Sequence, residues 1–283
     1  MDWILLTLLY GVIKGVRDVV KKESLKKSTV VEVLFFYTLF AFLLCIPASR
    51  DIGNIDPRFL PLIFVKAFVI FIAWILSFKA IKDLPLSVYG ILDLSRVLFA
   101  TLLGLLVLHE QSTINQIIGL ILVSGGLLLL RFGNISKKKE KENVKPVMVV
   151  LALLSCALNA VSGFLDKVLT KDVTASQLQF YYMLFLTLLY LFYMLFSKTK
   201  VSVKGSIKNY WIWILAILFV IADKSLFMAN AIPESRITIM TLVKQAGCVV
   251  SLAAGKFLYK EKNMLHKCVC TAIIVAGIVV AVM

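Results

Sequence analysis

The stretch FKAIKDLPLSVYGILDLSRVLFATLLGLLVLHEQSTINQIIGLILVSGG, residues 78–126, decides the fold, because a related stretch recurs later in the chain. Its counterpart is MANAIPESRITIMTLVKQAGCVVSLAAGKFLYKEKNMLHKCVCTAIIVAG, residues 228–277. After one residue of offset at the start, the two segments align without a gap, and Glu110 faces Glu261. The chain therefore contains an internal repeat that spans roughly half of its length.

Hydropathy places this repeat in a membrane. The chain is 60% hydrophobic with a mean hydropathy of +0.94, and apolar runs long enough to cross a bilayer as helices recur along it. The runs predict an all-α membrane protein with ten transmembrane helices, at residues 2–20, 29–48, 59–80, 85–107, 113–131, 147–167, 175–196, 209–231, 234–257 and 264–283.

The repeat divides these spans into two halves of five. Residues 1–146 form the first half, which ends in the basic linker 132–146, and residues 147–283 form the second. Glu32 also aligns with Gln177, 145 residues later. Because five is odd, the second half is predicted to insert upside down, as in inverted-topology transporters.

The loop charges give an orientation. Of the 31 Lys and Arg residues, 20 fall in the odd-numbered connections and 5 in the even-numbered ones. Positive charge favours the cytoplasm, so we expect a multi-pass protein of the cell (cytoplasmic) membrane with both termini outside. In a chain of this hydropathy the net charge of +15 reflects cytoplasmic loops rather than a nucleic-acid partner.

Here the chain resembles a known family. The residues that carry the resemblance are A-I-x-x-L-P at 80–85, Glu110, and G-L-I-L-V-S-G-G at 119–126, with Glu261 and AIIVAG at 272–277 in the second half. They are similar to the ten-span EamA-type members of the drug/metabolite transporter superfamily. The resemblance implies a central cavity between the repeats, alternating access, and transport of small metabolites such as amino acids, amines, nucleotide sugars or sugar phosphates.

Ionisable groups inside membrane spans mark functional sites. Lys14, Arg17 and Asp18 share one face of the first span, and Asp93 and Arg96 lie in the middle of the fourth. Lys244 is the repeat mate of Asp93, so the two should lie at similar depth. The predicted substrate-binding residues are Lys14, Arg17, Asp18, Trp74, Tyr89, Asp93, Arg96, Lys244 and Gln245, and the proton- or ion-coupling candidates are Glu32, Asp93 and Asp223.

Three readings of the substrate stay open. Interior basic groups outnumber acids, which favours an anionic or zwitterionic metabolite moved by a secondary active transporter. Choline or another amine, held by acidic and aromatic residues, is the alternative. A flippase for a lipid-linked intermediate shares the expected fold and is the third.

Other classes are excluded by missing motifs. No G-x-x-x-x-G-K-[ST] sequence and no CxxC or Cys/His metal spacing are present, and the two histidines, His109 and His266, lie at span ends. We therefore expect no enzyme, no cofactor and no metal. The expected partners are a small-molecule substrate, membrane lipids and a coupling proton or cation, and the sequence gives no oligomeric state.

Overall fold

The computed structural model describes residues 2–48, 55–107, 114–132, 145–197, 201–235, 240 and 243–282, and all statements below concern these residues. Helices account for nearly all of them, and no strand occurs in this part of the chain. The α-helices are α1 (Asp2–Ser24), α2 (Val30–Cys45), α3 (Leu60–Asp83), α4 (Leu86–Asp93), α5 (Arg96–Val107), α6 (Ile114–Phe132), α7 (Pro146–Leu169), α8 (Ala175–Phe196), α9 (Val203–Lys208), α10 (Tyr210–Ala231), α12 (Ala246–Phe257) and α13 (Met264–Val282).

Local sequence signals explain where several helices begin. Thr29 and Glu32 form a capping box at the start of α2, with side chain and backbone exchanging hydrogen bonds in both directions. Thr174 and Gln177 form the same capping box at the start of α8. The two pairs lie 145 residues apart in the chain, so α2 and α8 start in the same way.

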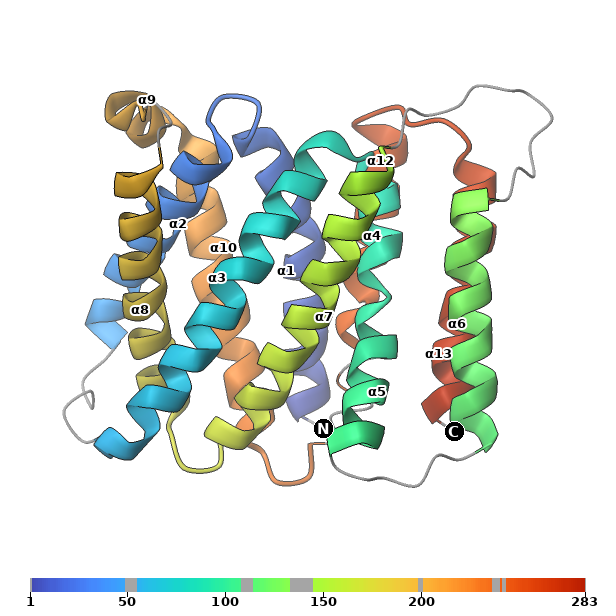
Figure 1. Ribbon diagram of the computed structural model, residues 1–283, viewed down its shortest axis with the longest axis horizontal. Coiled ribbons are helices and arrows are strands. Elements are labelled where there is room, and N and C mark those ends of the chain that lie inside the picture. Colours follow the sequence, from blue (N-terminus) through green and yellow to red (C-terminus); the bar gives the residue numbers. More distant parts are fainter. Residues whose placement is uncertain are drawn as a thin grey trace.

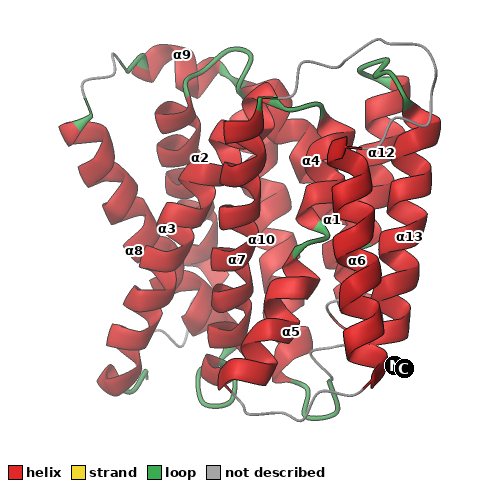
Figure 2. Ribbon diagram, turned by 45° about the vertical axis from the view of Figure 1, so that its right-hand side comes forward, coloured by secondary structure: helices red, strands yellow, loops and turns green. Residues whose placement is uncertain are grey.

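The helices form one bundle, and most of them run between the upper and lower edges of the view in Figure 1. α1 begins and α13 ends at the lower edge of this view. The main helix pairs are α1 with α10, α3 with α7, α2 with α8, and α6 with α13. α6 and α13 stand side by side at one end of the bundle in both ribbon views (Figures 1 and 2).

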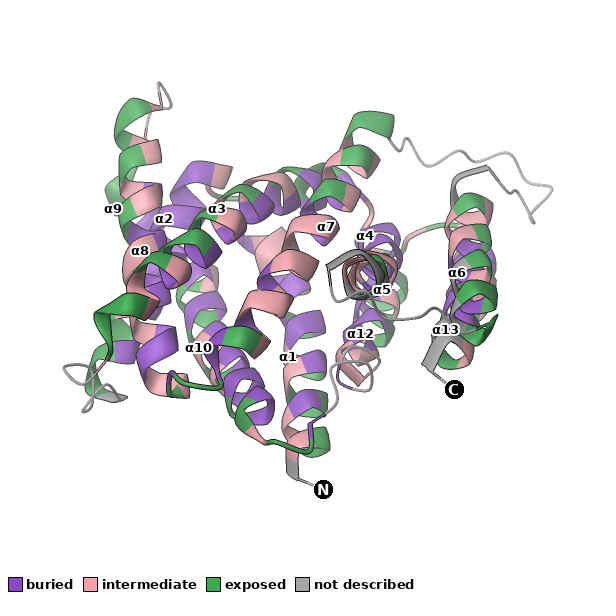
Figure 3. Cartoon of the chain, turned by 60° about the horizontal axis from the view of Figure 1, so that its bottom comes forward, coloured by how far each residue is buried: buried purple, intermediate pink, exposed green. Residues whose placement is uncertain are grey.

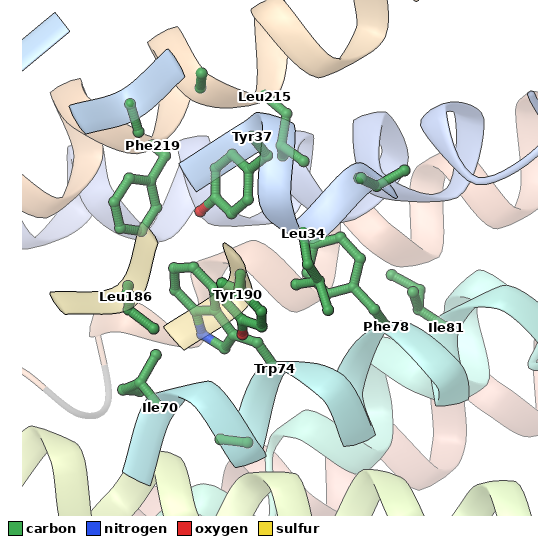
Figure 4. Close-up of a cluster of buried hydrophobic side chains, with 14 of the residues drawn as sticks. Leu34, Tyr37, Ile70, Trp74, Phe78, Ile81, Leu186, Tyr190, Leu215 and Phe219 are labelled. Carbon is green, nitrogen blue, oxygen red and sulfur yellow. The ribbon is translucent and has the colours of Figure 1, made fainter. Parts of the chain in front are cut away.

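An aromatic cluster fills the centre of the larger core. Tyr37 lies 5.4 Å from Trp74 and 5.3 Å from Phe219, measured between ring centroids, and Phe78 stacks on its other side. Figure 4 shows these rings converging from α2, α3 and α10. Rings at these separations pack favourably edge to face or offset, so the cluster ties three helices together.

Three glycines bring α1 and α12 into close contact. A Cβ at Gly15 would lie 2.5 Å from the carbonyl oxygen of Gly247, and one at Gly247 would lie 2.6 Å from that of Gly11. The sequence predicts close helix packing at the G-x-x-x-G of residues 11–15, and this is confirmed.

Four segments are long and apolar enough to cross a membrane, judged by length and composition: Pro57–Asp83, Pro146–Leu169, Ala175–Phe196 and Tyr210–Ala231. Shorter apolar helices accompany them, and green exposed residues face outward along many helices in Figure 3. The chain is therefore a membrane-embedded, multi-pass helical protein.

One expected element differs from the sequence prediction. Residues 85–107 are predicted as one continuous helix, and the structure contains two, α4 and α5, joined by a turn at Leu94 and Ser95. The turn is the green segment between α4 and α5 in Figure 2. The prediction is wrong at this point because no Pro or Gly marks the break and the surrounding residues are apolar.

Candidate functional site

The site lies where two helices are interrupted. In the α4–α5 turn the backbone tightens to i→i−3 hydrogen bonds, from the Leu94 N–H to Ile91, 3.1 Å, and from the Val97 N–H to Leu94, 3.2 Å. The Cys248 N–H donates to Gln245 in the same pattern, 2.9 Å, at the start of α12. These last two bonds occupy equivalent positions of the repeat, since 97 and 94 align with 248 and 245.

Asp93 is the centre of a three-residue charge cluster at the first break. Its carboxylate forms an ion pair with Lys14 of α1 and lies 2.7 Å from Nε of Arg96, across the turn. The Asp93 and Lys14 side chains are 6% and 11% exposed, while Arg96 is 22% exposed. Two cations share one carboxylate, so this cluster has an excess of one positive charge.

Arg17 makes a second interhelical contact. Its Nη1 lies 3.5 Å from the Asp223 carboxylate of α10, and its Nη2 donates to the hydroxyl of Tyr37, 3.3 Å. The guanidinium also stands 4.5 Å above the Phe219 ring, a cation–π distance. Asp18, on the same helix, pairs with Lys21 at 2.8 Å.

Lys244 stands at the second break, one residue before Gln245. In the described part of the chain, its ammonium has no carboxylate within ion-pair distance, and its nearest aromatic contact is the Tyr10 ring at 5.9 Å. Gln245 is buried. Lys244 is therefore a second cation of this region, at the second break, without an ion pair to an acid of the described residues.

Three other predicted residues lie in different surroundings. Trp74 belongs to the aromatic cluster described above, and the Tyr89 hydroxyl is 2.6 Å from that of Ser77. Glu32 accepts hydrogen bonds from the backbone N–H groups of Thr29, 2.7 Å, and Ser202, 2.6 Å, so its carboxylate holds a helix start and a loop. The structure thus brings Lys14, Asp93 and Arg96 into one cluster and pairs Arg17 with Asp223 in another. Lys244 forms an ion pair with neither cluster in the described residues.

One buried ion pair was missed by the sequence analysis. Lys66 of α3, 2% exposed, lies 3.1 Å from the carboxylate of Asp166 of α7. Lys66 lies six residues after the start of α3, and its ammonium pairs with Asp166 instead of reaching toward water. The sequence does contain one hint, because the pattern Gly15-x-x-Asp18 of α1 occurs again as Gly163-x-x-Asp166 in α7.

Metal chemistry has no evident site in the described residues. No group of three or more His, Cys, Asp or Glu side chains in this part of the chain could hold a metal ion. The arrangement instead offers cationic side chains of high hydrogen-bonding capacity next to two helix starts, which suits recognition of carboxylate or phosphate oxygens.

Comparisons with known proteins agree with this reading of the fold. The model of the EamA-like transporter family matches residues 1–132. A solved crystal structure, described only as that of a protein, superposes with a TM-score of 0.67 at 14% sequence identity, covering 99% of this chain and 96% of that chain. No curated protein matches the chain. The structural likeness concerns the fold alone.

Proposed function

Because the chain belongs, through residues 1–132, to the EamA-like transporter family of the drug/metabolite transporter superfamily, we propose that it is a secondary active transporter for a small anionic or zwitterionic metabolite. The observation that carries the proposal is the pair of cations at the two interrupted helices. Arg96 is the most exposed member of its cluster, and Lys244 has no acidic partner among the described residues.

The charges that a substrate would meet at this centre are positive. Asp93 is shared by Lys14 and Arg96, and Asp223 is held by Arg17, so the acids already have partners. α5 and α12 both begin here, and a helix start carries a partial positive charge. A carboxylate or phosphate between Arg96 and Lys244 would receive charge-assisted hydrogen bonds from both sides.

The helix pairing supports ten crossings arranged as two inverted halves, residues 1–146 and 147–283. The first helix of each half packs on the third helix of the other, as α1 with α10 and α7 with α3. The second helices pair with each other, and so do the last ones, as α2 with α8 and α6 with α13. A two-fold axis in the membrane plane would produce this pattern.

Alternating access then follows from the same symmetry. The two breaks place one flexible joint in each half, on either side of the substrate. Rocking of the halves about these joints would expose the substrate to one side of the membrane at a time. Loops rich in lysine lie at the upper edge of Figure 1, including the α8–α10 connection that holds α9. We assign this edge to the cytoplasm, which puts both termini outside, in the cytoplasmic membrane.

The amine alternative has less support from the geometry. It needs a free carboxylate beside aromatic rings, and Asp93 is bound by two cations. Trp74 is 9% exposed and packs among other rings, and we assign it to the core rather than to a cage around a quaternary amine. A flippase for a lipid-linked intermediate would use the same cationic centre for a lipid phosphate.

The test is thermal stability of the detergent-purified protein against a metabolite panel. The panel contains glucose 6-phosphate, a nucleotide, succinate, glutamate, choline and a polyprenyl phosphate. A ligand at about 100 times its dissociation constant stabilises the folded state by about 2.7 kcal/mol. We expect stabilisation by small anions, lost in Lys244→Ala and kept in Lys171→Ala, an exposed lysine after α7.

Each other pattern of stabilisation contradicts the proposal in a defined way. Stabilisation by choline alone would establish the amine reading and overturn the anionic one. Stabilisation by polyprenyl phosphate alone would favour the flippase. Anion effects that persist in Lys244→Ala would place the anion elsewhere in the protein.

A further inference from the structure

The buried pair of Lys66 and Asp166 is not used by the proposed substrate site. It joins α3 of the first half to α7 of the second, and the two side chains are 2% and 9% exposed. An ion pair inside a membrane protein is costly to desolvate, so its retention calls for a role.

The two partners are supported unequally. Lys66 Nζ lies 3.5 Å from the centroid of the Tyr182 ring and 5.5 Å from that of Phe227, so two aromatic faces also stabilise its charge. Within the described residues, Lys66 is the one cation in ion-pair distance of Asp166, and no backbone N–H donates to its carboxylate. Lys66 can therefore stay charged without Asp166, whereas the Asp166 carboxylate depends on Lys66.

Electrostatics connects this pair to the central site. The charges that act on Asp166 are Lys66 of α3 and Lys244, just before α12. Asp223 of α10 and Tyr182 of α8 also feel its field. On its own helix, the ammonium of Lys167 points elsewhere, to the carbonyl oxygens of Asn230 and Ser235. Lys244 favours the charged form of Asp166 without an ion pair to it in the described residues, so the lysine that faces the proposed substrate also acts on Asp166.

We propose that Asp166 is the proton-binding residue of the transporter, and that a proton binds there together with the anion. The step is a simple protonation: the carboxylate takes up one proton to become the neutral acid, and Lys66 remains an ammonium over Tyr182. The proposal rests on the anion site of the proposed function. It adds the residue that carries the coupled proton, and it predicts that anion and proton each strengthen the binding of the other.

The linkage follows from the shared lysine. An anion bound at Lys244 offsets the positive field that favours the charged form of Asp166, so proton binding becomes easier. Because linkage between two sites is reciprocal, a proton on Asp166 strengthens anion binding by the same factor. Anion and proton therefore move together, as in symport, and not in exchange.

The position of the pair suits proton entry from outside. Asp166 lies three residues before the end of α7, and Lys66 lies six residues after the start of α3, both within about two helical turns. Both helix ends lie at the lower edge of Figure 1, opposite the lysine-rich loops. In the proposed orientation this edge faces the exterior.

The first experiment needs no substrate. Infrared difference spectra of the purified protein, between mildly alkaline and mildly acidic solution, detect the carbonyl band of a buried protonated carboxyl group. We expect a band that is absent in Asp166→Asn and unchanged in Asp172→Asn, whose side chain is exposed at the same helix end. A spectrum identical in wild type and Asp166→Asn would overturn the proposal.

Folding of the variant is controlled by removing both charges. Asp166→Asn alone leaves Lys66 buried and unpaired, so the double variant Lys66→Met/Asp166→Asn is measured beside it. The double variant should also lack the band while keeping a cooperative thermal transition. A band that persists in the double variant contradicts the assignment in the same way.

The second experiment separates the coupling from the substrate site. Glucose 6-phosphate or succinate is added to weakly buffered protein, and proton uptake is followed with a pH dye. We expect uptake in wild type, stabilisation without uptake in Asp166→Asn, and neither in Lys244→Ala. If the anion stabilises the wild type without proton uptake, the coupling is wrong and the anion site stands. If the anion has no effect at all, both the anion site and the linkage are wrong.

Discussion

The acids at the upper edge of the bundle and the acids in its middle are held by different partners. Glu261 accepts hydrogen bonds from the backbone N–H groups of Leu86, 2.6 Å, and Ser87, 3.2 Å, and from Lys267 at 3.1 Å. In the middle, Asp93 depends on the cations Lys14 and Arg96, from two helices.

This difference distinguishes an acid with a structural role, Glu261, from an acid of the proposed substrate site, Asp93. Backbone N–H groups cannot leave an acid without unfolding a helix start, so Glu261 fixes α4 against the segment between α12 and α13. Cationic side chains can exchange one anion for another by rotating a few bonds. In the proposed transporter, the centre is therefore the place where a substrate anion would compete with, or join, the protein's own carboxylates.

The largest effect is expected for Asp93→Asn, which removes the charge of the carboxylate at the centre of the bundle. The change leaves the buried Lys14 and the partly buried Arg96 without their shared counter-charge. Removing one partner from a buried ion pair costs about 3–5 kcal/mol of unfolding free energy. Denaturant unfolding in detergent measures it, with Asp172→Asn as control; equal stability of both variants would contradict the cluster.

A smaller loss is expected where α1 meets α12, the contact that brings Lys14 near Lys244. Gly15→Ala places a methyl group 2.5 Å from the carbonyl oxygen of Gly247, and such overpacking costs about 1–3 kcal/mol. Gly163→Ala, in α7, meets nothing within 4 Å. The control should be neutral or gain up to about 1 kcal/mol. Similar thermal transitions for the two variants would contradict the close α1–α12 packing.

Glu261→Gln tests the acid at the upper edge, which we expect to have a structural role only. The neutral amide keeps one acceptor oxygen but loses the charge that faces Lys267 and the start of α4, at a cost of about 1–3 kcal/mol. We expect lower stability with an unchanged response to anions in the thermal assay. A changed choice between anions and amines would show that Glu261 belongs to the substrate site.

The smallest effect concerns the contact between Tyr259 and Glu23. Partial burial alone would raise the pKa of Glu23, but hydrogen bonds from Lys26 and Tyr259 hold it below its ordinary value. Such a group stabilises the fold above its unfolded-state pKa, and the contribution is lost as pH falls through the folded-state pKa. Tyr259→Phe should cost about 0.5–1.5 kcal/mol at neutral pH and less in acid. A difference between wild type and variant that grows in acid would contradict this sign.

Sequence reasoning reached the all-helical membrane architecture because the length of an apolar run is a one-dimensional signal. It also identified the polar residues of the centre, since a charge within an apolar run stands out. Pairing could not be predicted in this way: Asp93 faces Lys14 of another helix, and Lys66 reaches Asp166 from 100 residues away in the chain. These contacts depend on how α1, α3 and α7 rotate about their axes.

The helix breaks were missed for a related reason. Leu94 and Gln245 have no conformational signature of their own, and the turn at each is stabilised by the surrounding bundle rather than by a Pro or Gly. Glu32 is a different case, because an acid near a span end can also serve as a helix cap. Its capping partner Thr29, three residues earlier, was the signal that it holds a helix start.

The most direct test of the central claim compares Lys244→Arg with Lys244→Gln, because the two changes differ mainly in charge. The measurement is the dissociation constant for succinate or glucose 6-phosphate by isothermal titration calorimetry in detergent. We predict that the arginine variant binds within a few-fold of wild type, and that the glutamine variant binds at least about tenfold more weakly, a loss of about 1.4 kcal/mol. Equal affinity in wild type and Lys244→Gln would contradict an anion site built around this lysine.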